Sequence, residues 1–289
     1  MFGRGPIMVR SRVKLRHCRM SATFDPGICV EPFVTLCEQA PDESAYPYGA
    51  FRVEWGPIFH RGRLDGTARV LCVGQDPAQS EAIVRRILIG VAGHRVQGFL
   101  AKLGIDRSYV MINAFLYSLY NQSRAAPHID DTAVAGYRNR WFSALLASGA
   151  LEAVVSFGSL ADIAWRGFAK SNAAAAALAY CHVPHPTSPE SAGGSPQQIE
   201  AATAAMLVKW NSALQSLRRS VLHPDAVRPF VPYGANFQPE ELVAIPLFDV
   251  PAGIPRWMCG ADAWASRTGT TAAEKRRTIS VEVPDGIIP

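Results

Sequence analysis

Three polar side chains stand where short apolar runs of the sequence end, and each can take part in chemistry. Asp76 follows one run in the stretch Gly-Gln-Asp-Pro, Asn113 ends a second, and His185 follows a third. A carboxylate can stabilise a developing cation, an amide can both donate and accept hydrogen bonds, and an imidazole can exchange a proton. Each motif alone is also typical of a turn or cap, so their positions relative to one another decide whether they form a site.

Four apolar segments have the length and composition of buried β-strands: residues 68–73, 109–115, 151–157 and 180–183. Segments with helical spacing follow them, around 96–103, 130–149, 160–168 and 195–219. This alternation predicts a three-layer α/β/α fold with a central, mostly parallel four-stranded sheet. In such sheets ligands bind at the carboxyl ends of the strands. The residues expected along this edge are Asp76, Asn113, Gly158 and His185.

The 289 residues predict one α/β domain over residues 20–221 and an extended segment, 222–289, that packs on it. Residues 1–19 contain six basic residues and no acidic residue, whereas the whole chain has a net charge of +5. The rest of the chain is therefore close to neutral. We expect this basic stretch to be disordered, either as a nucleic-acid-binding arm or as an extension upstream of a start at Met20.

The composition gives no sign of a membrane segment or a metal site. No stretch approaches the roughly 18 apolar residues that span a bilayer. The six cysteines form no Cys-x-x-Cys pair, and their spacing fits neither a disulfide framework nor zinc or iron–sulfur ligation. We expect a cytoplasmic monomer without metal or cofactor.

In this order, the motifs resemble those of the uracil-DNA glycosylase superfamily over about residues 68–190. Gly-Gln-Asp-Pro at 74–77 resembles the first catalytic motif of that superfamily. Gly90-Val91-Ala92-Gly93 is similar to a segment of its iron–sulfur branch, and His185-Pro186-Thr187 resembles the opening of its second catalytic motif. The resemblance implies a monofunctional hydrolase that releases uracil from single- or double-stranded DNA and leaves an abasic site for base-excision repair.

The resemblance also implies roles for individual residues. Asp76 and His185 would be catalytic, and Asn113 would read the edge of the base. The uracil-binding set would comprise Gly74, Gln75, Asp76, Ala78, Leu88, Asn113 and His185. Basic residues near the first motif and the residues of the second motif predict a DNA-binding set of Arg86, His94, Arg95, Thr187, Ser188 and Pro189, with Pro189 in the place of a wedge residue.

Two departures from the superfamily pattern leave alternatives open. Ala78 stands where a common branch has the tyrosine that blocks the thymine methyl, and Leu88 lies where an aromatic ring would stack on the base. The chain is therefore also compatible with a glycosylase for deaminated purines, or with a protein that binds or crosslinks uracil-containing or abasic DNA. A serine hydrolase is disfavoured because the stretch Ser-Phe-Gly-Ser at 156–159 lacks the Gly-x-Ser-x-Gly elbow.

Overall fold

A computed structural model describes residues 23–287 of the chain. The basic stretch 1–19 lies outside the described residues. Within the described part, no helix combines the length and apolarity needed to cross a membrane.

The fold is built around one mixed five-stranded sheet with the strand order β2-β4-β3-β6-β7. Four strands are parallel, and β2 pairs antiparallel with β4 at one edge. The sequence predicts four strands, and the structure adds a fifth, β2, at the edge of the sheet. With three residues, the added strand is too short to show a periodic pattern. The strands are β2 (His60–Gly62), β3 (Val70–Gly74), β4 (Tyr109–Asn113), β6 (Ala153–Phe157) and β7 (Ala179–Val183).

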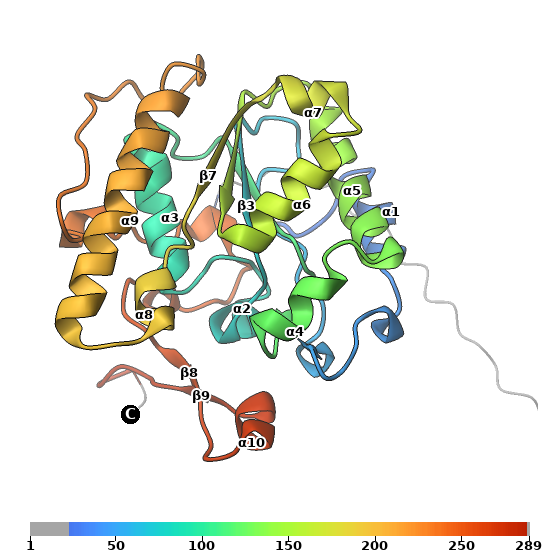
Figure 1. Cartoon of the computed structure of the whole chain (residues 1–289), viewed down its shortest axis with the longest axis vertical. Coiled ribbons are helices and arrows are strands. Elements are labelled where there is room, and N and C mark those ends of the chain that lie inside the picture. Colours follow the sequence, from blue (N-terminus) through green and yellow to red (C-terminus); the bar gives the residue numbers. More distant parts are fainter. Residues whose placement is uncertain (1–22, 288–289) are drawn as a thin grey trace, which may run out of the picture.

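Helices cover both faces of the sheet, giving three layers (Figure 1). The helices α3 (Val91–Lys102) and α9 (Pro196–Leu217) cover one face, and α5 (Thr132–Leu146) and α6 (Ser159–Ala169) cover the other. Side chains of β3 alternate between the two apolar cores, with Leu71 and Val73 in one and Val70 and Cys72 in the other. Because both faces are covered, the whole strand is apolar, as its sequence predicts.

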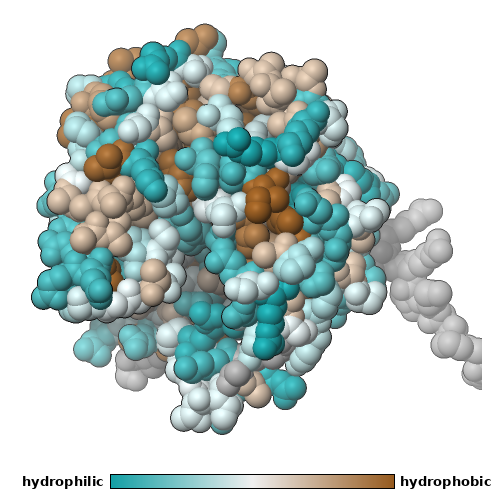
Figure 2. Space-filling model, in the orientation of Figure 1, coloured by the Kyte–Doolittle hydropathy of each residue, from teal (hydrophilic) through white to brown (hydrophobic). Residues whose placement is uncertain are grey.

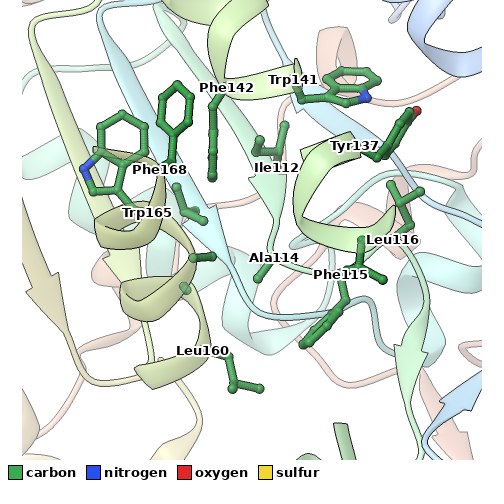
Figure 3. Packing of buried hydrophobic residues seen from close by; sticks show 14 of the residues in the cluster. Ile112, Ala114, Phe115, Leu116, Tyr137, Trp141, Phe142, Leu160, Trp165 and Phe168 are labelled. Atoms are coloured by element: carbon green, nitrogen blue, oxygen red, sulfur yellow. The ribbon is translucent and has the colours of Figure 1, made fainter. Parts of the chain in front are cut away.

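Aromatic rings join α5 and α6 to the sheet (Figure 3). Phe142 meets Trp165 edge-on, with ring centroids 5.2 Å apart, and lies equally close to Phe168. Full burial of a large apolar side chain contributes about 1.5–3 kcal/mol. This packing holds α6 against α5 and the sheet.

The remaining features are the cap of α9, two small sheets and several short helices and strands. Ser195 and Gln198 form a capping box at the start of α9. Two additional two-stranded sheets join β1 to β5 and β8 to β9. The remaining elements are α1 (Phe33–Glu38), α2 (Gln79–Val84), α4 (Gln122–Ala125), α7 (Ala173–Ala177), α8 (Ser188–Ala192), α10 (Ala272–Arg277), β1 (Phe51–Arg52), β5 (Ser118–Leu119), β8 (Ala265–Arg267) and β9 (Ile279–Val281).

Residues 222–287 cross the body of the molecule and end in the hairpin formed by β8, α10 and β9 (Figure 1). Asp249 of this segment is fully buried and forms ion pairs with Arg61 and Arg63. Trp264, just before β8, belongs to a third apolar cluster that also contains Ile89. The segment is therefore attached through buried contacts, and it reaches the carboxyl edge of the sheet.

Candidate active site

A cleft of about 920 Å³ opens at the carboxyl edge of the sheet, where the parallel strands end. Figure 2 shows the surface hollowed in its lower half, above the C-terminal hairpin, with mostly hydrophilic residues around the hollow. The cleft brings together segments that are far apart in the sequence. The predicted site residues that line it are Gln75, Asp76, Ala78, Leu88, His185, Thr187 and Ser188.

Asp76 is a partly buried carboxylate on the floor of the cleft. One oxygen, Oδ2, accepts a hydrogen bond from the backbone N–H of Leu119 at 2.9 Å. Burial raises the pKa of Asp76 to about 6, and the nearby carboxyl of Glu81 also raises it. The Leu119 hydrogen bond and the charges of Arg52 and Arg267 lower this pKa and so limit the shift. The carboxyl is therefore ionised at neutral pH, and no described side chain neutralises it in an ion pair.

His185 lines the same cleft as a neutral imidazole. The backbone N–H of Thr187 donates a hydrogen bond to Nδ1 at 3.3 Å. Burial lowers the pKa of His185 to about 4, the charge of Arg95 lowers it further, and Glu190 opposes the shift. Because Nδ1 acts as an acceptor, the proton of the neutral ring lies on Nε2, which has no hydrogen-bond partner among residues 23–287.

Gln75 contributes to the framework of the cleft. Its Oε1 accepts hydrogen bonds from the backbone N–H of Leu160, at 3.1 Å, and from Nε2 of Gln122, at 3.0 Å. Gly158 has a φ of 95°, and a Cβ there would lie 2.7 Å from the Gln75 side chain. A glycine at this strand end therefore allows the Gln75 amide to hold the start of α6 and the residues of α4 in place.

Leu88 lies in the cleft on a strained loop. Its φ is 53°, in the left-handed region that costs a non-glycine residue about 1–2 kcal/mol. A Cβ on Gly93 would lie 1.7 Å from the carbonyl oxygen of Leu88, so only glycine permits α3 to approach the loop this closely. The second glycine of the Gly90-Val91-Ala92-Gly93 segment is thus required by the close packing of α3 against the Leu88 loop.

Glu81 is a site residue that the sequence did not single out. It is 5% exposed and lines the cleft. Its two carboxyl oxygens accept hydrogen bonds from the backbone N–H groups of Ala78 and Ile89, each at 3.0 Å. Burial raises the pKa of Glu81, and these backbone hydrogen bonds oppose the shift. Glu81 therefore links the Asp76 turn to the Leu88 loop, and its position three residues after Ala78 was the available signal.

Asn113 lies behind the wall of the cleft and does not line it. Its Oδ1 is buried and accepts no hydrogen bond from any described residue. A Cβ on Gly74 would lie 2.2 Å from this oxygen and 3.9 Å from Leu88, so all three residues meet at the end of β3. Gly74 and Asn113 occupy paired positions on neighbouring strands, as expected for adjacent strand ends.

The residues after His185 differ in their access to the cleft. Thr187 and Ser188 line it, whereas Pro189 is buried at the first turn of α8. The prediction of Pro189 as a wedge is therefore corrected: proline fits the start of a helix, and this ring is covered by protein. Ala78 is exposed at the cleft and carries only a methyl group.

Three predicted DNA contacts are engaged within the protein instead. Arg86 forms an ion pair with Asp25. His94 is 1% exposed, and its Nδ1 is 2.8 Å from the carbonyl oxygen of Val243.

Arg95 also lies outside the cleft lining. It donates to the carbonyl oxygen of Pro186 and pairs with Glu190, both at 2.6 Å. It thereby holds the His185 loop from behind. The basic cluster in the sequence is consequently distributed among internal contacts, and its charges do not form a common surface at the cleft.

The C-terminal segment supplies part of the cleft wall that the sequence did not indicate. Gln79 Nε2 donates to the carbonyl oxygen of Ala265, 186 residues further along the chain, at 3.2 Å and so attaches β8 to α2. Residues 261–267 have no motif, and nothing in their sequence predicts this contact. The cleft-lining residues from this segment are Asp262, Ala263, Ala265 and Arg267.

Within residues 23–287, no three His, Cys, Asp or Glu side chains converge as a metal-binding group. No protein-family model matches the chain, and no curated protein matches it either.

Proposed function

We propose that the protein is a DNA glycosylase of the uracil-DNA glycosylase type, which hydrolyses the N-glycosidic bond of deoxyuridine and releases uracil. One observation carries this proposal: an ionised carboxylate and a neutral histidine donor line the same cleft, Asp76 on one strand end and His185 beyond another. Glycosidic cleavage separates charge in a way that these two groups match.

Asp76 stabilises the sugar. As the glycosidic bond breaks, the sugar acquires oxocarbenium character, and an anion close to it lowers the barrier. Oδ2 is held by the N–H of Leu119, while Oδ1 has no partner among the described residues, so it faces the sugar and the attacking water. The absence of a paired cation keeps the full negative charge available.

His185 stabilises the departing base. The electrons of the broken bond move onto uracil, and the developing charge on its carbonyl oxygen accepts a hydrogen bond from Nε2–H. A preorganised donor of this kind contributes about 3–4 kcal/mol. The neutral state suits this role because Thr187 fixes the tautomer and the low pKa keeps the ring neutral at physiological pH.

Base selection involves the end of β3. The base must leave the helical stack to reach the cleft, at a cost of about a few kcal/mol. We place one edge of the base at the end of β3, beside Leu88; the unpaired Oδ1 of Asn113 lies behind this wall and does not line the cleft. Leu88 would cover one face of the base with an aliphatic side chain.

A second candidate substrate class is the deaminated purines. Ala78 is exposed and small, and the cleft is larger than a pyrimidine requires. Hypoxanthine and xanthine also present an N–H next to a carbonyl. The thymine methyl meets no bulky side chain at Ala78 either, so a thymine mismatch belongs in the same comparison.

The test is an assay of the purified protein on single- and double-stranded oligonucleotides that contain uracil, hypoxanthine, xanthine or a thymine mismatch, with alkaline cleavage to reveal abasic sites. Asp76→Asn and His185→Ala are expected to lose most base release while retaining the fold. Lys170→Gln, an exposed change beyond the far end of α6, serves as the control. Full activity in both site variants would refute the proposal, and equal rates on all four bases would remove the preference for uracil.

A further inference from the structure

Arg267 is a charged residue of the cleft that the mechanism does not use. It lies in β8, is exposed, and is the only lysine or arginine among the residues that line the cleft in the described chain. No hydrogen bond or ion pair of its side chain occurs within residues 23–287. The positive charge of Arg267 interacts electrostatically with Asp76 and lowers the pKa of that carboxyl.

The hairpin that carries Arg267 is held firmly at its base. Trp264 is 5% exposed, and its indole N–H donates to the carbonyl oxygen of Met258 at 2.9 Å. The backbone N–H of Glu282 donates to the carbonyl oxygen of Trp264 at 2.8 Å, and the carbonyl oxygen of Ala265 accepts a hydrogen bond from the Gln79 side chain. The position of Arg267 beside the cleft is therefore fixed by the fold.

The outer part of the hairpin is basic. Residues 265–281 contain four basic residues and one acidic residue. The acidic residue, Glu274, is engaged in capping α10 through Thr270 and Thr271. The cleft lining also includes the hydroxyl side chains of Thr187, Ser188 and Ser191, and the carboxyl of Asp262 from the same segment as Arg267. The cleft thus offers one positive charge and several hydroxyl groups, and both kinds of group contact the phosphodiester backbone in protein–DNA complexes.

We propose that the β8–β9 hairpin is a DNA-binding wall of the cleft and that Arg267 binds a phosphate of the strand next to the extruded nucleotide. This inference rests on the proposed DNA substrate. It assigns the C-terminal segment to recognition of the strand, while Asp76 and His185 act on the bond. The sequence placed these contacts at Arg86, His94 and Arg95, which the fold engages elsewhere.

The experiment compares wild type, Arg267→Gln, Arg267→Lys and Arg267→Glu in binding a fluorescent, uracil-free single-stranded oligonucleotide between roughly 50 and 300 mM salt. Arg219→Gln is the matched control, because this arginine lies just beyond the end of α9, far from the hairpin (Figure 1). Thermal unfolding of each variant verifies folding.

Loss of one charged phosphate contact is expected to weaken binding at low salt about fivefold to tenfold in Arg267→Gln. The slope of log affinity against log salt should fall by about 0.7, the value for one contact with a single strand. Arg267→Lys should retain the slope, and Arg267→Glu should bind more weakly than Arg267→Gln.

The outcomes separate this inference from the proposed function. If wild type releases uracil but the Arg267 variants bind with an unchanged salt slope, the inference fails and the glycosylase proposal stands. If wild type binds the oligonucleotide with a slope that depends on Arg267 but releases no base, the glycosylase proposal fails and the binding wall stands. A wild-type protein that neither binds DNA nor releases a base from it overturns both.

Discussion

Asp76 and Asp249 are two acidic side chains that the fold treats in opposite ways. Asp249 is fully buried, pairs with Arg61 at 3.2 Å and Arg63 at 2.7 Å, and accepts a hydrogen bond from the hydroxyl of Tyr109. Asp76 lies at the cleft with one backbone N–H donor and no paired cation among the described residues. Neutralised carboxylates hold a structure together, whereas a carboxylate left charged at a cleft is available for chemistry.

The two carboxylates also have opposite effects on the stability of the folded protein. The Asp249 network joins the C-terminal segment to β2 and β4, so removing one partner would leave buried arginines unpaired. The Asp76 site raises the pKa of its carboxyl to about 6, which means that the folded state disfavours the charged form that the reaction needs. Four predictions test whether these two carboxylates really have such different roles.

The largest expected effect is on stability at Asp249. Asp249→Ala should lower the free energy of unfolding by about 3–5 kcal/mol, because Arg61 would remain fully buried without its counter-charge. Chemical denaturation of wild type and variant measures this difference. Asp225→Ala, which removes a partly exposed carboxyl from the same C-terminal segment, is the control and should cost less. Equal losses at the two positions would contradict the structural role of the buried pair.

Asp76→Asn should lower the rate of base release by about 10²–10³-fold, because a neutral amide cannot compensate the positive charge on the sugar. Single-turnover kinetics on a uracil oligonucleotide give this number. Asp249→Asn, studied at a temperature where it remains folded, should stay within about tenfold of wild type. A larger loss at Asp249 than at Asp76 would reverse the assignment of the two carboxylates.

The same Asp76→Asn change should stabilise the folded protein by about 1–2 kcal/mol at pH 7.5, with allowance for the partial exposure of the side chain. The folded pKa of about 6 lies above the unfolded value of 3.8, so the folded state binds the proton more tightly. Stability from this group therefore falls as pH rises from about 4 to 6, and the cost persists above pH 6. The advantage of the variant should vanish near pH 4, which denaturation at the two pH values can establish.

The pH profile of kcat/KM should rise through an apparent pKa near 6 and then level off. The rising limb reports ionisation of Asp76, and His185, with a pKa lowered to about 4, is already neutral throughout this range. Glu81→Gln should move the limb to lower pH, because the Glu81 carboxyl raises the pKa of Asp76. A limb that persists unchanged in Asp76→Asn would show that another group controls it.

The sequence by itself determined the strand ends and the polar residues that follow them. The apolar runs of β3, β4, β6 and β7 lie in a parallel sheet covered on both faces, so their pattern is local and visible in the chain. Because parallel strands share one carboxyl edge, the convergence of Asp76 and His185 on one cleft follows from the order of the motifs along the chain.

Tertiary structure alone decided which charges remain free at that edge. Arg86, His94 and Arg95 look like a basic surface in the sequence, but each is engaged by a partner from a distant segment. Arg267 shows no motif, yet the hairpin brings it to the cleft without a partner in the described chain. Ion pairing and burial depend on contacts between segments far apart in sequence, and local patterns carry no information about them.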